Sequence, residues 1–139
     1  MLRSFTAAPL LTAILFATAM SACASDGATT KPTEDTSMRT VAAGQATSMA
    51  QGASVRLSDG ATLKFVAVPQ DSRCPPGVQC IRAGDADIEF AFTPAGGSAT
   101  TVTPNLPEAP MKPIGAWHLT VEQLTFGSAP VATVRIDPQ

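Results

Sequence analysis

The most reactive side chains of this sequence belong to Cys74 and Cys80, which flank a short turn containing two prolines. Their C-x5-C spacing differs from the C-x-x-C spacing of thiol oxidoreductases, and no histidine lies beside them to favour a thiolate. A zinc site needs about four ligands, which two cysteines and the distant His118 do not supply. The spacing therefore favours a structural role over thiol catalysis or metal binding.

Other candidate catalytic and metal-binding residues lack the neighbours that their chemistry requires. His118 is the only histidine, and the local alternation places it on the outward face of a predicted strand. Ser72 follows Asp71, but no G-x-S-x-G motif surrounds it. Three acidic residues alternate along another predicted strand without the D-x-D-x-D-G loop of a calcium site, namely Asp85, Asp87 and Glu89. We therefore predict that the protein is not an enzyme and has no catalytic residue, metal site or cofactor.

The N-terminus has the features of a bacterial lipoprotein signal. Arg3 precedes an apolar stretch, residues 8–20, that is too short for an ordinary membrane-spanning helix. The sequence M-S-A-C at residues 20–23 resembles the lipobox, in which a cysteine is lipidated and becomes the mature N-terminus. The resemblance implies lipidation of Cys23, and Ala24 after it implies an outer-membrane protein facing the periplasm. The alternative is a secretory peptide cleaved at an A-x-A-like site nearby.

Lipidation of Cys23 leaves Cys74 and Cys80 as a pair in an oxidising compartment, which predicts a disulfide between them. Closing so small a ring contributes roughly 2 kcal/mol by restricting the unfolded chain. Pro75 and Pro76 restrict it further, and the glycine that follows, Gly77, allows the positive φ of a turn.

The residues before the ring predict how its conformation is held. Asp71 is placed to accept the backbone N–H groups of Arg73 and Cys74, as in an Asx-turn, and Arg73 or Arg82 would balance its charge. We expect the motif, including Ser72, to be mainly a structural staple. The alternative is a recognition loop. Residues 75–79 would pack against strands in the first case and protrude into solvent in the second.

Composition and charge divide the chain into three parts. Lys and Arg number 9 and Asp and Glu 11, without a basic cluster, which excludes a nucleic-acid partner. Residues 1–22 are predicted to be the signal peptide. Residues 23–44 form the lipidated N-terminus and a flexible tether rich in Thr, Ser, Ala and Gly. Residues 45–139 form one domain.

That domain shows alternating apolar residues and no helical periodicity. The pattern predicts an all-β fold, a small antiparallel β-sandwich or partly open barrel of about six to eight short strands. Leu124 and Phe126 fall out of phase with the preceding residues, which predicts a β-bulge near Glu122–Gln123. Val55 and Leu57, then Leu63, Phe65 and Ala67, are expected to face inward, as are Ala132 and Ile136. One shared core is expected to contain Ala86, Ile88, Phe90, Phe92, Trp117, Leu119, Val121 and Val134.

Prolines recur at every third position between two of these strands, at Pro104, Pro107, Pro110 and Pro113. This period matches a polyproline II helix. We expect a stiff crossover that also blocks edge pairing. The alternative is a ligand for a proline-recognising partner.

Residues 59–90 resemble a group of small bacterial envelope proteins and lipoproteins. Their shared stretch runs from a strand through D-S-R-C-P, a short turn, a second cysteine and Ala-Gly to another strand. The residues that match it are Asp71, Ser72, Arg73, Cys74, Pro75, Cys80, Ala83 and Gly84. The group usually has Trp where Arg82 stands here. The resemblance covers most of residues 46–136 and implies a compact β domain in the envelope.

The function expected from these features is that of a non-enzymatic cell-envelope lipoprotein. Its disulfide-stapled β domain would bind or support another envelope component, while the N-terminal lipid attaches it to the membrane. The alternative is an inhibitor of a periplasmic hydrolase that presents the Cys74–Cys80 loop, because a rigid, closed loop binds with little cost of ordering.

Overall fold

The computed structural model describes residues 38–139, and the predicted signal peptide, Cys23 and most of the tether lie outside this range. The described part contains ten strands and no helix, so none of its elements is a helix that could cross a membrane. The strands are β1 (Arg39–Thr40), β2 (Thr47–Ala50), β3 (Ser54–Arg56), β4 (Thr62–Asp71), β5 (Ala86–Thr93), β6 (Thr100–Val102), β7 (Asn105–Leu106), β8 (Met111–Ile114), β9 (Trp117–Leu124) and β10 (Val131–Pro138).

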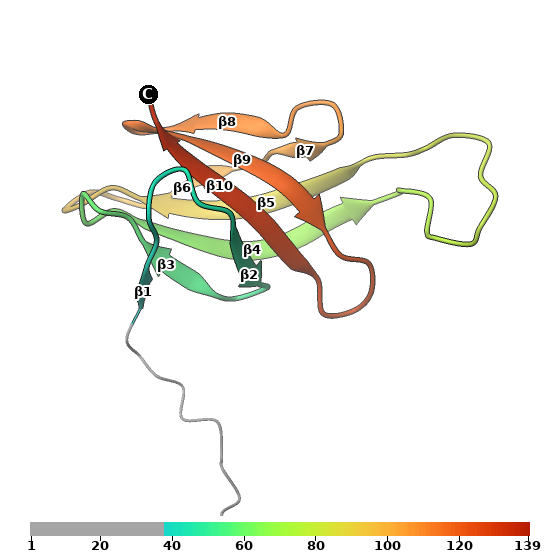
Figure 1. Ribbon diagram of the computed structural model, residues 1–139, viewed down its shortest axis with the longest axis horizontal. Coiled ribbons are helices and arrows are strands. Elements are labelled where there is room, and N and C mark those ends of the chain that lie inside the picture. The colour runs from blue at the N-terminus through green and yellow to red at the C-terminus, as the bar shows by residue number, and fades with distance from the viewer. Residues whose placement is uncertain (1–37) are drawn as a thin grey trace, which may run out of the picture. The chain divides into compact units, whose positions relative to one another are not determined.

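The strands form two sheets that pack face to face (Figure 1). The six-stranded sheet has the order β1-β3-β4-β5-β6, and its sixth strand, β7, pairs with β5 along the same edge as β6. The four-stranded sheet has the order β2-β10-β9-β8. Pairing is antiparallel except between β1 and β3. The predicted all-β fold is confirmed, and of the two predicted architectures the structure has the sandwich, because the two sheets do not close into a barrel. Two strands are only two residues long, which leaves eight longer ones, within the expected range.

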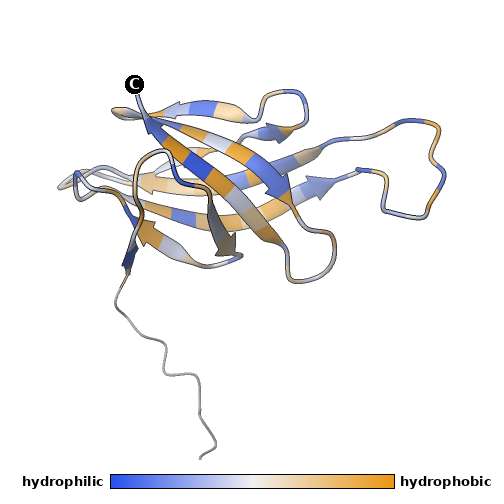
Figure 2. Cartoon of the chain, viewed as in Figure 1, coloured by the Kyte–Doolittle hydropathy of each residue, from blue (hydrophilic) through white to orange (hydrophobic). Residues whose placement is uncertain are grey.

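The core lies between the sheets and contains all eight residues predicted to share it. Along β5 every second residue is buried, because successive side chains of a strand point to opposite faces. Phe90 of β5 stacks on Phe65 of β4 with ring centroids 5.3 Å apart. Figure 2 shows the same alternation of apolar and polar residues along β9 and β10. Ala67 departs from the expectation, since it is only half-buried where β4 shifts register after Phe65.

The predicted β-bulge is confirmed in β9. Val121 and Gln123 pair with the adjacent Val134 and Thr133 of β10, which leaves Glu122 as the extra residue. This shift returns Leu124 to the core. Phe126 lies beyond the end of the strand and is 41% exposed.

The domain begins earlier than residue 45, the boundary predicted from the sequence. Arg39 and Thr40 pair in parallel with Val55 and Arg56, and Val41 is buried in the core. A two-residue strand carries no apolar period, so composition alone assigned this segment to the tether.

The proline-containing segment crosses from one sheet to the other, as expected, but it is not a continuous polyproline II helix. Asn105 pairs with β5, and it exchanges backbone hydrogen bonds with Ala109 across a turn that contains a cis Leu106–Pro107 bond. Pro113 lies in β8, at the edge of the four-stranded sheet, where a missing N–H does not interrupt a central ladder.

Candidate functional site

The most prominent feature of the surface is the loop that joins β4 to β5, which extends far beyond the end of the sandwich (Figure 1). We call residues 74–82 the cysteine loop. The predicted Cys74–Cys80 disulfide is present. Every residue from Pro75 to Arg82 is exposed, so the ring does not pack against the strands. The loop therefore has the geometry expected of a recognition loop, and the staple packed on the sheet is not observed.

The two arms of the loop are held together at its base. The Ser72 N–H donates to the Asp85 carbonyl and the Cys74 N–H to the Ala83 carbonyl, both at 2.8 Å. Gly84 has a φ of +69°, and a Cβ at this position would overlap the Ser72 carbonyl oxygen. The arms can approach this closely only because residue 84 has no side chain. Gly77 has the predicted positive φ at the turn, +80°.

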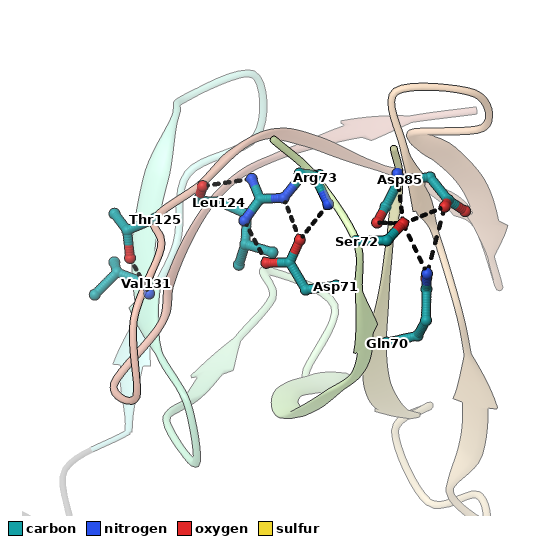
Figure 3. Close-up of polar contacts among 8 residues, drawn as sticks. All are labelled: Gln70, Asp71, Ser72, Arg73, Asp85, Leu124, Thr125 and Val131. Atoms are coloured by element: carbon teal, nitrogen blue, oxygen red, sulfur yellow. Dashed lines mark hydrogen bonds and ion pairs between the residues drawn. The ribbon is translucent and has the colours of Figure 1, made fainter. Parts of the chain in front are cut away.

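Arg73 joins the loop base to the opposite sheet (Figure 3). Its Nε and Nη2 donate to the two carboxylate oxygens of Asp71 at 2.9 and 2.7 Å, and its Nη1 donates to the Leu124 carbonyl at 2.8 Å. Its guanidinium also lies over the Phe126 ring, 4.2 Å from the centroid. Asp71 ends β4 and Leu124 ends β9, so this one side chain connects both sheets where the loop leaves the domain.

Asp71 accepts the backbone N–H of Arg73 at 3.1 Å, as predicted. The other half of that prediction is wrong, because the Cys74 N–H is already paired with the Ala83 carbonyl across the loop base. Of the two arginines considered, Arg73 balances the charge of Asp71. Its hydrogen bond holds the pKa of Asp71 below its usual value.

A second polar network lies on the other side of the loop base (Figure 3). The Ser72 hydroxyl donates to the Asp85 carboxylate at 3.0 Å and accepts the Asp85 N–H at 3.1 Å and the Gln70 amide at 3.0 Å. The Asn105 amide of β7 donates to Asp85 and to Asp87, both at 2.8 Å. Hydrogen bonds from Asn105, then Ser72 and Gln70, lower the pKa of Asp85. Asp85, just before β5, and Asp87 within it thus hold the β7 turn through Asn105. Residues 38–139 contain no group of three or more His, Cys, Asp or Glu side chains arranged for a metal.

A groove runs beside the cysteine loop, with a volume of about 560 Å³. Its walls are the loop base, Leu106 and Pro107 of the β7 turn, and residues 122–126 at the end of β9. Its lining is largely apolar, and Leu106, Leu124 and Phe126 contribute to it. Sequence patterns did not indicate the groove, because its walls come from three distant segments. The out-of-phase position of Phe126 was the one available signal.

His118 lies away from the loop base, in the middle of the four-stranded sheet. It pairs with Pro113 of β8 and Asp137 of β10 and is half-buried. The structure therefore does not bring the histidine together with Ser72, the serine considered as a nucleophile.

We expect Asp71→Ala to lower the free energy of unfolding by roughly 1–3 kcal/mol, because it leaves the donors of Arg73 unpaired. The Arg73 side chain is only 14% exposed, so water does not fully replace the carboxylate. Asp71→Asn keeps an acceptor oxygen and should lose less. Denaturant titrations measure the difference, with the exposed Glu108→Ala as a control expected within about 0.5 kcal/mol of wild type. Wild-type stability of both Asp71 variants would contradict the assigned role of this carboxylate.

The domain should lose stability as the pH falls below about 4, the unfolded-state pKa of aspartate. Hydrogen bonds from the Trp117 indole to Asp59 and from Arg73 to Asp71 lower both pKa values in the folded state. A carboxylate whose pKa is lowered by folding stabilises the fold at pH values above its unfolded-state pKa. This stabilisation is lost as the pH falls through its folded-state pKa. Denaturant titrations between about pH 6 and pH 2 measure it. A double Asp59→Asn, Asp71→Asn variant should show a flatter dependence, and an unchanged slope would contradict the prediction.

Comparison of the chain with protein-family models, curated proteins and solved structures finds no match. The features that stand out on the surface of the described domain are the protruding cysteine loop, the contacts of Arg73 with Asp71 and Leu124 at its base, and the groove beside it.

Proposed function

We propose that this protein is a non-enzymatic binding module of the bacterial cell envelope that contacts another envelope protein through the cysteine loop. The observation that carries the proposal is the exposure of two aliphatic side chains on this loop. Val78 is 57% exposed, and Ile81 is fully exposed. Burying such a side chain against a partner contributes roughly 1.5–3 kcal/mol, whereas a loop that served only to close a ring would not need them.

The rigidity of the loop supports the same proposal. The disulfide closes the ring, and Arg73 fixes the direction in which the base leaves the two sheets. A partner therefore meets a loop that is already ordered, which reduces the entropy lost on binding.

The location of the protein is part of the proposal and rests on the lipobox-like residues and the resemblance to envelope proteins. β1, the first described strand, and the cysteine loop lie toward opposite ends of the domain (Figure 1). A lipid at Cys23 would attach the chain on the side of β1, so that the loop is presented away from the anchor.

We expect Cys23→Ser to move the protein from the membrane fraction to the soluble fraction. The serine cannot form the thioether to which the lipid is attached, and the apolar segment alone is too short for a usual span. Fractionation followed by immunoblotting measures the shift. Cys80→Ser, which removes a cysteine outside the lipobox, is the control and should stay with the membrane. Unchanged membrane association of Cys23→Ser would contradict lipid anchoring.

A second candidate function is inhibition of a periplasmic hydrolase. The cysteine loop protrudes beyond the sandwich (Figure 1) and carries exposed apolar side chains, which favours this function because such a loop fits a concave active-site cleft. In that case the loop residues would contact the residues that line the cleft of one enzyme.

One experiment tests the binding function and separates the two candidates. A photo-reactive benzoylphenylalanine replaces Gln79 in the full chain, and irradiation of intact cells is followed by identification of the crosslinked peptides. We expect a defined envelope protein, absent when the probe replaces Thr101, an exposed residue of β6. Crosslinks to a hydrolase cleft would favour the inhibitor, and no protein crosslink beyond the Thr101 control would contradict both functions.

A further inference from the structure

A second pocket lies between the returning arm of the cysteine loop and the β7 turn. It has a volume of about 580 Å³ and is lined by Ser72, residues 82–85, Pro107 and Glu108. We call it the loop–turn pocket. Its volume falls within the range of protein pockets that bind small ligands, roughly 300–1,000 Å³. The pocket is therefore large enough for a ligand of a few residues or less.

Asp85 joins the two walls of the loop–turn pocket. Its carboxylate accepts the Ser72 hydroxyl of the loop base at 3.0 Å (Figure 3) and the Asn105 amide of β7 at 2.8 Å. The Asn105 amide also donates to Asp87 of β5 at 2.8 Å, so the turn is held at two points. Because both walls are tied to one side chain, the pocket is formed before a ligand arrives, which reduces the cost of ordering on binding.

The loop–turn pocket contains two side chains of opposite charge that are not paired with each other. Arg82 belongs to the loop wall and Glu108 to the turn wall, and both are exposed. Within residues 38–139 neither of them forms an ion pair. A ligand with a single charge would be attracted by one wall and repelled by the other. A ligand that carries both an anionic and a cationic group matches both walls, and such complementarity gives specificity.

The loop wall also offers hydrogen-bond donors of the backbone. Ala83 and Gly84 line the pocket, and within residues 38–139 neither of their N–H groups donates to a backbone carbonyl. The Ala83 carbonyl, in contrast, already accepts the Cys74 N–H. A backbone N–H is a strong donor, and the natural acceptor for it is a carbonyl oxygen. The free groups of this pocket therefore fit a peptide better than another zwitterion without a carbonyl group.

We propose that the loop–turn pocket binds a short peptide with free termini, whose carboxylate pairs with Arg82 and whose ammonium group pairs with Glu108. Arginine can hold a carboxylate through two parallel N–H···O bonds, which fixes the orientation of the peptide. The N–H groups of Ala83 and Gly84 are the donors for its carbonyl oxygen. This inference goes beyond the proposed function, because the ligand is small and its site lies at the base of the cysteine loop rather than at its tip.

Titration of the isotope-labelled full-length chain with the dipeptide Ala-Ala tests the site by NMR. We expect the amide resonances of Ala83 and Gly84 to shift until they saturate, while those of Leu124 and Phe126 in the groove stay unchanged. N-acetyl-Ala-Ala lacks the ammonium group, and Ala-Ala-amide lacks the carboxylate. Each should bind about threefold more weakly than Ala-Ala, because it loses one exposed ion pair.

Variants assign each charge of the peptide to one side chain. Glu108→Gln should weaken the binding of Ala-Ala about threefold but should not weaken that of N-acetyl-Ala-Ala, which has no ammonium group to lose its partner. Arg82→Gln should weaken Ala-Ala equally and should not weaken Ala-Ala-amide. Lys64→Gln, at an exposed position of β4, is the control and should leave the affinity for Ala-Ala unchanged.

The outcomes separate this inference from the proposed function. The site would be overturned by a lack of saturable shifts at Ala83 and Gly84, or by equal affinities for the three peptides. Losses in the variants that do not depend on which terminus is blocked would overturn it as well. All of these results leave the binding of an envelope protein standing, because that crosslink starts from Gln79 in the ring. Conversely, a lack of crosslinks from Gln79 would not affect the peptide site.

Discussion

The Phe90→Ala variant should lose roughly 3–5 kcal/mol of unfolding free energy, the range for removing a fully buried phenylalanine. Phe90 is completely buried in the middle of β5, between β4 and β6, and stacks on Phe65. Alanine leaves a cavity between the two sheets that neighbouring strands cannot fill without breaking their pairing. Because a domain of this size is typically stable by about 5–15 kcal/mol, this loss is a large share of the total.

Denaturant titration followed by the fluorescence of Trp117, itself a core residue, measures this loss. Glu89→Ala is the matched control, because Glu89 precedes Phe90 in β5 and points to the opposite face. It should change the free energy of unfolding by less than about 1 kcal/mol. A loss below about 1 kcal/mol for Phe90→Ala would contradict the assignment of the buried face of β5.

We expect Gly84→Ala to lower the free energy of unfolding by roughly 2–5 kcal/mol. A methyl group at this position overlaps the backbone carbonyl of Ser72, and the arms of the loop must separate to admit it. The expected loss combines about 1–2 kcal/mol for a left-handed alanine with about 1–3 kcal/mol for the overlap. Separation breaks the hydrogen bonds of Ser72 to Asp85 and of Cys74 to Ala83.

Gly77→Ala separates the cost of the steric overlap from the cost of a left-handed backbone at alanine. Gly77 also has a positive φ, +80°, but a Cβ there meets no atom within 4 Å. This variant should lose only about 1–2 kcal/mol, and the amides of Ser72 and Cys74 should stay protected from hydrogen exchange. In Gly84→Ala these two amides should exchange faster. Equal losses and equal exchange in the two variants would contradict a steric role for Gly84.

Variants at the base of the cysteine loop and variants at its tip should alter different properties of the loop. Substitutions at Asp71 or Gly84 should change the direction and order of the cysteine loop, because these residues hold its base, while its tip keeps its side chains. Substitutions at Val78 or Ile81 change the contact surface and leave the base intact. A partner whose binding responds to both kinds of change recognises the loop in the conformation that Arg73, Asp71 and Gly84 hold.

The sequence by itself determined the fold class, the buried faces of the main strands, the bulge at Glu122 and the Cys74–Cys80 disulfide. These features are local or depend on simple periods. The alternation of apolar residues along β5 assigns Phe90 to the core, whichever sheet the strand joins. Likewise, an extra residue in a strand shifts the alternation of the residues that follow, which indicates the bulge at Glu122. Two cysteines separated by a short turn can pair without knowledge of the rest of the fold.

The tertiary structure alone decided where the domain begins, whether the loop protrudes, and which residues hold it. Arg73 reaches Leu124 and Phe126 across 51 and 53 positions of the chain, and Asn105 reaches Asp85 across 20. Contacts of this kind depend on how the two sheets stack and where β7 returns to β5. No period or spacing along the chain indicates which residues make these contacts, because the packing of the two sheets brings them together.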